Sequence, residues 1–376
     1  MPKKTILTFI GYYLPGYKSG GPVRTISNMV DLLHENYDFK VVTRDRDMLE
    51  NKPYDNIKIN DWNDYPHHKV YYTNKDTKLA DVINKTEFDV YYLNSFFDYN
   101  FSIKIMLLLK AGKIPVKPVL LAPRGELMSG ALSLKSFKKK FFIKTSNISG
   151  IYKNITWHAS SEYEAEEIKR EMGRQIKLKI AMDVPDPDLR KVERTRVKKA
   201  DELKILYLAS ITPKKNLLFA IEVLNKVEGN FTFDIYGSIK DEKYWRKCLN
   251  HISGRIKDRV TYKGIVPNDQ IHTIYPNYDI FFFPTLGENY GHVIYESLYF
   301  GTPVLCSDRT PWDRLDEFVA GWNIELAQQK RFVDRIDELT FLEDVEYKKF
   351  INGCSDYHNS FRNSNIKNDN LKLFYS

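Results

Sequence analysis

Residues 281–306 read Phe281-Phe-Phe-Pro-Thr-Leu-Gly-Glu288-Asn-Tyr-Gly-His292-Val-Ile-Tyr-Glu296-Ser-Leu-Tyr-Phe-Gly301-Thr-Pro-Val-Leu-Cys306. An apolar run is followed by a glycine-containing loop, an amphipathic segment, a Gly-Thr-Pro turn and a second apolar run. This order predicts strand, loop, helix, turn and strand, which is the repeating unit of a parallel α/β sheet. The loop then lies at the carboxyl end of a strand, where such sheets bind ligands.

The loop carries groups that suit anions and hydroxyls. The backbone N–H groups of Asn289, Tyr290 and Gly291 open the predicted helix, and the first N–H groups of a helix have no partner inside it. Glu296 follows Glu288 by eight residues, so both carboxylates project from one side, about two turns apart. A carboxylate accepts two hydrogen bonds from the vicinal hydroxyls of a ribose or a hexose. Two glutamates alone are common in a charged protein, and it is the surrounding Gly-Glu-Asn-x-Gly-His that makes them a candidate site.

Apolar runs alternate with amphipathic stretches along the whole chain, which predicts parallel strands joined by crossover helices. Helices are predicted at 25–33, 163–172, 216–227, 269–275 and 291–300, the second opening with a Ser161–Glu164 capping box. The predicted strands are 5–11, 39–43, 70–72, 90–93, 119–122, 155–159, 204–209, 231–236, 260–263, 280–283 and 303–306.

The alternation stops once and restarts, which predicts two domains of the α/β class. A Pro-Asp-Pro break after Val184 and the charged run 190–202 mark the boundary. We expect a first doubly wound, Rossmann-like domain at 1–186, a linker at 187–202 and a second such domain at 203–346. The segment 347–376 reads as a helical tail that packs back on the first domain. Two such sheets in series place a ligand cleft between their carboxyl ends.

Composition narrows the class of protein. The net charge of +8 favours an anionic partner, but no nucleic-acid recognition motif accompanies it. Three scattered cysteines, Cys248, Cys306 and Cys354, fit a reducing cytoplasm better than a disulfide framework. No apolar run approaches the ~18–20 residues that span a bilayer. The expected location is therefore cytoplasmic, with peripheral contact to the inner face of the membrane as a further possibility.

The segment 281–306 resembles the donor-site signature of the family 4 retaining glycosyltransferases, which have the GT-B fold. The resemblance covers about 203–326 and extends more weakly to the first half. It includes Ile211-Thr-Pro-Lys-Lys-Asn216, Asp234-Ile-Tyr-Gly237, Gly264-Ile-Val-Pro, Thr310-Pro-Trp312 and Gly321-Trp322. The resemblance implies a nucleoside-diphosphate sugar as co-substrate, UDP- or GDP-linked, with no other cofactor and no metal.

The resemblance also implies roles for individual residues. Glu296 would hold the ribose, and Glu288 a hydroxyl of the transferred sugar, positioning it rather than attacking it. Lys215 would bind the diphosphate. The supporting donor-site positions are Asn289, Tyr290 and Gly291 through their amides, Val266 through backbone groups to the base, Lys214 beside Lys215, and His292 in the loop or in helix packing.

One position departs from the family pattern. The family commonly has an arginine a few residues before the lysine, where this chain has Ser210. Arg124, in Pro-Arg-Gly-Glu-Leu after a predicted strand, is our candidate for a replacement cation that faces the reaction centre. The alternative is that Arg124 caps a helix or forms a salt bridge.

The first half supplies further candidates. Gly20 and Gly21 permit a tight turn with exposed amides before a helix, which resembles the family's first glycine loop near the donor phosphate and acceptor. A P-loop is excluded because Tyr17 separates Gly16 from Lys18. Asn94 and Ser95, after the predicted strand 90–93, are candidates for the acceptor pocket.

The segment from Lys135 to Lys144 mixes lysines with three phenylalanines. A basic aromatic helix can lie on an anionic membrane, and the alternative is a solvated face with an ordinary core stripe. The membrane reading would bring a lipid-linked acceptor beside the cleft.

The function expected from the resemblance is retaining transfer of a sugar to a hydroxyl of a glycan, free or lipid-linked, in cell-surface polysaccharide synthesis. Two alternatives remain open: a GT-B epimerase that acts on a nucleotide sugar without an acceptor, and a non-catalytic peripheral membrane or glycan-binding protein. Turnover of donor alone to an isomer distinguishes the first, and nucleotide binding without transfer the second.

Overall fold

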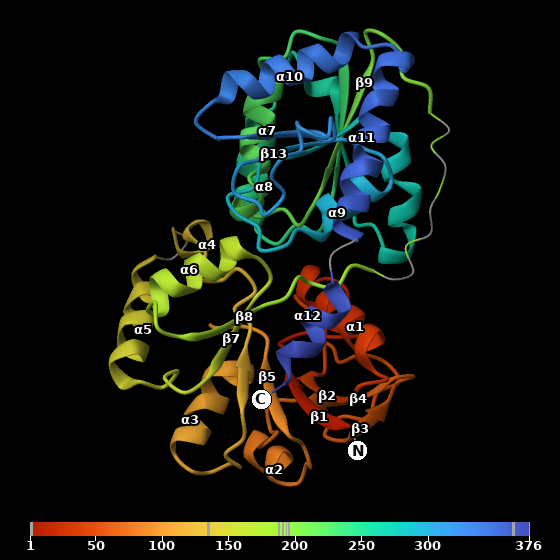
Figure 1. Ribbon diagram of the computed structural model, residues 1–376. Helices are drawn as coiled ribbons and strands as arrows, with labels where there is room; N and C mark the ends of the chain where they lie inside the picture. Colours follow the sequence, from red (N-terminus) through yellow and green to blue (C-terminus); the bar gives the residue numbers. More distant parts are fainter. Residues whose placement is uncertain are drawn as a thin grey trace. The chain divides into compact units, whose positions relative to one another are not determined.

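The structure is a computed structural model that describes residues 3–133, 136–186, 189, 192, 194, 196–362 and 365–375. The chain forms two compact units (Figure 1). Unit 1 comprises Met1–Pro187 with Asn365–Ser376, and unit 2 comprises Asp188–Ser364. Among the helices of the described residues, none has the length and apolarity needed to cross a bilayer.

Unit 1 is built on an eight-stranded sheet of order β3-β4-β2-β1-β5-β6-β7-β8. All neighbouring strands are parallel except β3, which runs antiparallel to β4 at the edge. The strands are β1 (Lys4–Phe9), β2 (Tyr37–Arg44), β3 (Trp62–Asp64), β4 (His68–Thr73), β5 (Val90–Leu93), β6 (Val119–Leu121), β7 (Thr156–Ala159) and β8 (Lys177–Ile180).

Helices cover both faces of this sheet because alternate strand residues are apolar on both sides. One core layer joins the sheet to α1 and α12, and the other joins it to α2, α3, α5 and α6. These helices are α1 (Gly21–Leu33), α2 (Leu79–Asn84), α3 (Lys104–Lys110), α5 (Ser136–Ser149), α6 (Glu162–Met172) and α12 (Ile366–Leu373), with the short α4 (Ser129–Ser133) before α5. The predicted cap of α6 is present, since the Ser161 hydroxyl accepts from the Glu164 N–H.

Unit 2 has a six-stranded parallel sheet of order β11-β10-β9-β12-β13-β14. Within it α7 packs against α8 and α10, and α9 packs against α11. Its elements are β9 (Leu203–Leu208), α7 (Leu217–Leu224), β10 (Phe231–Tyr236), α8 (Glu242–Asn250), β11 (Val260–Gly264), β12 (Ile280–Phe283), α9 (His292–Tyr299), β13 (Val304–Ser307), β14 (Gly321–Ile324), α10 (Gln329–Phe341) and α11 (Asp344–Arg362). Short 3₁₀ turns lie at Pro213–Lys215, Lys257–Arg259, Asn268–Thr273 and Tyr275–Asn277.

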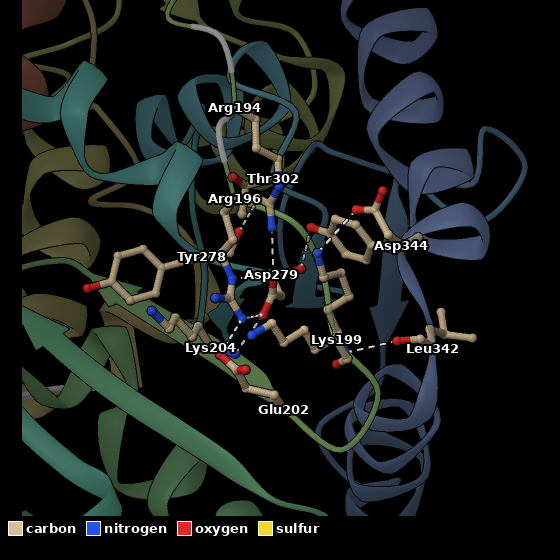
Figure 2. A network of polar contacts seen from close by, with 12 residues as sticks. Arg194, Arg196, Lys199, Glu202, Lys204, Tyr278, Asp279, Thr302, Leu342 and Asp344 are labelled. Carbon is tan, nitrogen blue, oxygen red and sulfur yellow. Dashed lines mark hydrogen bonds and ion pairs between the residues drawn. The ribbon is translucent and has the colours of Figure 1, made fainter.

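A buried ion-pair network fixes the segment that leads into β9 (Figure 2). Its centre is Asp279, fully buried just before β12. One Asp279 oxygen lies 2.6 Å from an Arg194 nitrogen, and Arg196 contacts both oxygens at 3.0 and 2.9 Å. The Lys204 N–H donates to the same carboxylate at 2.9 Å. The Tyr347 hydroxyl donates to the Asp279 carbonyl, and its ring lies 4.9 Å from the Arg194 guanidinium.

Lys198 fastens the same segment to the end of α10. Its side chain is buried, and its ammonium donates to the carbonyls of Thr340 and Leu342 at 3.2 and 3.0 Å, where a cation is favoured by the helix dipole. The Lys198 N–H donates to Asp344 at the start of α11. Described residues from Arg194 onward are therefore built into unit 2, whereas the sequence suggested a linker up to residue 202.

The expected tail 347–376 is divided between the two units. Helix α11 packs on α9 in unit 2, and only α12 belongs to unit 1. There Leu373 and Phe374 are buried in the core layer that contains α1. The Asn370 amide donates to the Met182 carbonyl at 2.9 Å. The α11 segment carries apolar residues that cover α9, which explains why it does not extend as a single tail with α12.

Candidate functional site

Unit 2 brings two of the predicted donor-site residues into contact. The Lys215 ammonium forms an ion pair with the Glu288 carboxylate, although the two residues are far apart in the sequence. The Lys215 side chain is 21% exposed and that of Glu288 is 8% exposed. Lys215 also lies over the Phe283 ring, 5.4 Å from its centroid. The pair therefore sits at the carboxyl end of β12, as the strand-loop-helix pattern predicts.

The 284–291 loop, between β12 and α9, is braced from one side by the turn that carries Lys215. The Leu286 N–H donates to the Lys214 carbonyl at 2.8 Å, and the Asn216 amide donates to the Pro284 carbonyl at 2.9 Å. The Thr285 hydroxyl lies 3.2 Å from the Lys214 carbonyl and 3.2 Å from Glu288. These bonds fix the distance between the ammonium and carboxylate without help from a ligand.

Glu288 is charged despite its burial. Burial by itself raises the pKa of a carboxyl. Here the charges of Lys215 and Lys214, together with hydrogen bonds from Lys215 and Thr285, outweigh that effect, so the pKa of Glu288 is lowered. At neutral pH this side chain is an acceptor only, which suits sugar hydroxyls.

The start of α9 presents the predicted amides. Gly291 is the N-cap with φ 82°, a left-handed conformation that favours glycine. Tyr290 is buried, and its ring contacts that of His292 at 4.9 Å. His292 is the first helical residue and is also buried, so its ring belongs to the packing under the loop.

Glu296 lies one turn into α9 with 1% of its surface exposed. The Tyr275 hydroxyl lies 3.2 Å from its carboxylate and 2.8 Å from the Val293 carbonyl. Tyr275, itself fully buried, was not among the sequence candidates. Its signal was only a tyrosine in a short amphipathic run.

The remaining donor-site candidates of unit 2 lie at the ends of other strands. Val266 is partly exposed and follows β11 by two residues. Ser210 is partly exposed and follows β9, as does the turn with Lys214 and Lys215. Because β9, β11 and β12 are parallel, these strand ends and the 284–291 loop share one edge of the sheet.

In unit 1 the glycine turn has the predicted form. Gly20 is the N-cap of α1 with φ 82°, and a Cβ there would meet open space. Gly21 is the first residue of the helix. The Asp47 carboxylate accepts from the Tyr17 and Lys18 N–H groups at 2.9 and 3.1 Å. The Asp47 carboxylate thus fixes the turn, and Gly20 borders open space.

Arg124 is committed to a buried network inside unit 1. Its guanidinium pairs with Asp183 at 2.5 Å, and its Nη2 donates to the Asn94 side chain at 2.8 Å and to the Tyr92 hydroxyl. The side chain is 5% exposed. Asp183 also accepts from the Thr25 hydroxyl of α1 at 3.1 Å. The arginine charge is therefore matched within the unit, which corresponds to the salt-bridge alternative weighed for this residue.

Ser95 likewise faces an internal partner. Its hydroxyl donates to Glu126, which also accepts from the Phe96 and Phe97 N–H groups at 2.6 and 2.9 Å. Glu164 accepts from the Gly125 N–H at 2.6 Å. Glu164 is buried and Glu126 is partly buried, and their hydrogen bonds fix the 123–129 loop, a role that nothing in the sequence indicated.

Within the part of the chain that the structure describes, no three His, Cys, Asp or Glu side chains cluster in a way that could hold a metal ion. Unit 2 brings together a cation on the 213–215 turn with a carboxylate and a helix start on the 284–291 loop. Such a set can bind a ligand that carries both an anion and hydroxyl groups.

Comparisons with known proteins identify proteins that this chain resembles. Residues 190–353 match the family model described as glycosyl transferases group 1. An uncharacterized 41.2 kDa protein in the cps region of Klebsiella pneumoniae is 21% identical over 310 residues, covering 79% of this chain and 82% of that protein.

Two solved structures share the fold across nearly the whole chain. Sucrose-phosphate synthase from Thermosynechococcus elongatus is 15% identical with a TM-score of 0.72, covering 99% of this chain and 97% of that one. HepE from Anabaena, solved in complex with UDP and glucose, is 14% identical with a TM-score of 0.68, covering 98% of both chains. Residues 190–353, which make up less than half of the chain, therefore resemble the glycosyl transferases group 1, and the fold of the chain is GT-B.

Proposed function

We propose that this protein is a retaining glycosyltransferase that moves a sugar from a UDP-sugar to a hydroxyl of a glycan in cell-surface polysaccharide synthesis. The observation that carries the proposal is the Lys215–Glu288 pair beside the start of α9. The family match supports the reaction class. The cps-region relative supports the polysaccharide context, and the UDP complex of a protein with the same fold supports the nucleotide.

In this proposal each donor-site residue of unit 2 has one role. Glu296 accepts hydrogen bonds from the ribose, and Glu288 holds a hydroxyl of the sugar. Lys215 and the first N–H groups of α9 stabilise the departing diphosphate, the place where charge develops. The acceptor hydroxyl attacks the anomeric carbon on the face that the diphosphate leaves, and its proton passes to the leaving phosphate oxygen. Arg124 has no task at the donor, because its charge is matched by Asp183.

A Glu296→Ala variant should bind UDP about 10- to 100-fold more weakly than the wild type. The physical reason is the loss of hydrogen bonds from ribose hydroxyls to a charged acceptor, worth about 1.5–3 kcal/mol. Calorimetric titration with UDP, GDP and their sugars measures this. Glu317→Ala is the matched control, because that glutamate lies exposed in the same unit and pairs with Arg314.

The same titration decides between the alternatives. Tight binding of GDP instead of UDP would correct the base and keep the site. Conversion of the donor to an isomer without an acceptor would identify an epimerase. An absence of binding by every nucleotide would overturn the donor site and leave a non-catalytic, glycan-binding protein.

The same proposal places a lipid-linked acceptor beside an anionic membrane, which unit 1 contacts through α5. Lys135 lies outside the described residues, but the rest of the segment forms this helix. Phe137, Phe141 and Ile148 are 83%, 62% and 78% exposed. Their spacing of four and seven residues places them on one side of the helix. The opposite side is buried, with Ile143 and Phe142 in the core layer.

The lysines beside the exposed residues Phe137, Phe141 and Ile148 indicate what kind of partner this apolar stripe binds. Lys138, Lys140 and Lys144 are exposed along the same helix, and the Lys110 ammonium of α3 reaches the Ser149 carbonyl at its end. Figure 1 shows α5 at the outside of unit 1, beside α6. Exposed aromatic rings flanked by lysines match a bilayer whose surface carries anionic lipids.

A Phe137→Ser, Phe141→Ser double variant should bind vesicles of phosphatidylglycerol and phosphatidylcholine at least tenfold more weakly in a sedimentation assay. Burying one phenylalanine contributes about 1.5–3 kcal/mol. Phe341→Ser is the matched control, since Phe341 is 63% exposed but lies in unit 2. Equal loss in both variants, no vesicle binding by the wild type, or a concentration-dependent dimer broken by the double variant would each contradict membrane docking.

A further inference from the structure

We propose that Trp312 is a positioning residue for the donor: its indole N–H holds the Tyr290 carbonyl and thereby aims the amides at the start of α9. This inference rests on the proposed donor site. Trp312 lies between β13 and β14, is 2% exposed, and donates its Nε1–H to the Tyr290 carbonyl. The sequence singled out Thr310-Pro-Trp312 only as part of the family resemblance and gave it no task.

The geometry of the peptide group makes this contact directional. In a trans peptide the C=O and the following N–H lie in one plane and point in opposite directions. Holding the Tyr290 oxygen therefore also sets the direction of the Gly291 N–H. Gly291 has a left-handed backbone with wide conformational freedom, so this peptide would rotate readily without a fixed partner.

Trp312 is itself held rigidly, as a brace must be. Its carbonyl accepts from the Asn323 side chain on β14. Its ring lies 5.5 Å from that of Tyr290 and 6.2 Å from that of Tyr357 on α11. A Cβ on Gly291 would lie 3.5 Å from the indole nitrogen, which shows how closely the ring approaches the loop.

The contact between Trp312 and Tyr290 supports the second half of the 284–291 loop, whereas the turn with Lys214 supports the first half. The 309–312 segment makes a second contact, because the Glu288 N–H donates to the Arg309 carbonyl at 3.0 Å. The first half of the loop is thus fixed by residues 214–216 and the second half by residues 309–312. Both halves are needed to keep the Glu288 carboxylate and the helix amides in one arrangement.

The test compares Trp312→Phe with Trp322→Phe. The first substitution keeps an aromatic ring and removes the N–H. The second makes the same change on β14, where the Trp322 ring lies 5.2 Å from that of Phe350 at a tilt of 53° and below the Arg335 guanidinium. We expect Trp312→Phe to bind UDP within threefold of the wild type, and to lose about tenfold in kcat/KM for the UDP-sugar.

Hydrogen exchange measured without a ligand tests the contact between Trp312 and Tyr290 independently of the proposed donor site. Backbone amides of residues 288–293 should exchange about tenfold faster in Trp312→Phe and at the wild-type rate in Trp322→Phe. Unchanged exchange at 288–293 would overturn the brace. So would equally faster exchange across all of unit 2, which would mean a general loss of stability. If the brace is seen but wild-type protein binds no nucleotide, the proposed function fails and the positioning contact stands.

Discussion

A Glu288→Gln variant should transfer sugar on the order of 100-fold more slowly than the wild type while binding UDP within about threefold of it. Electrostatic contacts made only at the reacting sugar carry effects of this size on kcat. The amide keeps the shape of the side chain, so the loop contacts with Thr285 and Lys215 lose charge but not volume. UDP binding is spared because the nucleotide is held elsewhere.

Because Glu288 pairs with Lys215, the same substitution should affect UDP affinity in the opposite direction from turnover. In the donor-free protein, the Glu288 carboxylate neutralises Lys215. Its replacement by an amide leaves the ammonium available to the diphosphate, so UDP affinity should hold steady or rise slightly. Lys215→Met should do the reverse and weaken UDP binding. Glu317→Gln serves as a control for the loss of one surface carboxylate.

Steady-state kinetics measures the effect on turnover, and calorimetry measures the effect on UDP affinity. A Glu288→Gln enzyme with wild-type kcat would remove Glu288 from the reacting centre. Equal losses in UDP affinity and in turnover would place it at the nucleotide instead of the sugar.

The largest effect on stability should come from Asp279→Asn, at about 3–5 kcal/mol, because removing one partner of a buried ion pair leaves the others uncompensated. Two guanidinium groups, those of Arg194 and Arg196, are 7% and 13% exposed and would lose the charge they face (Figure 2). Urea unfolding measures the loss, and hydrogen exchange localises it. Faster exchange is expected in β9 and β12 and not in β1.

Glu338→Gln is the control, since its ion pair with Arg335 is half exposed and such pairs contribute about 0–1 kcal/mol. A loss in Asp279→Asn no larger than in this control would mean that the network is neutral. Faster exchange in both units would mean that the effect is not confined to unit 2.

The strands that the sequence predicted well have strong apolar patterns, continuous in β5 and β12 and alternating in β10. β5, β10 and β12 begin and end where the pattern placed them. Three strands were missed: β8 alternates Lys-Leu-Lys-Ile at the sheet edge, β3 has three residues, and β14 reads Gly-Trp-Asn-Ile at the edge of the second sheet. The predicted helix 269–275 became a 3₁₀ turn at Asn268–Thr273, ahead of Pro276.

The sequence offers candidate residues for the site but not their arrangement. Lys215 and Glu288 were each found through resemblance, but their contact depends on β9 and β12 being neighbours, which a local pattern does not contain. Trp312 and Tyr275 support the loop through a carbonyl and a carboxylate, and nothing in the sequence marks such partners. Arg124 looked available because its partner, Asp183, lies after five intervening elements.

The Asp279 network also determines at which residue an expressed fragment of unit 2 should begin. A fragment that began at Leu203, where the first strand of unit 2 starts, would keep the aspartate buried and discard both arginines and Lys198. The Asp279 carboxylate lies just before β12. The uncompensated charge would therefore destabilise the strand that leads into the loop with Glu288. Expression of unit 2 alone therefore calls for a start before Arg194, because a fragment that begins at the first residue of β9 would destabilise β12, which leads into the loop of the proposed donor site.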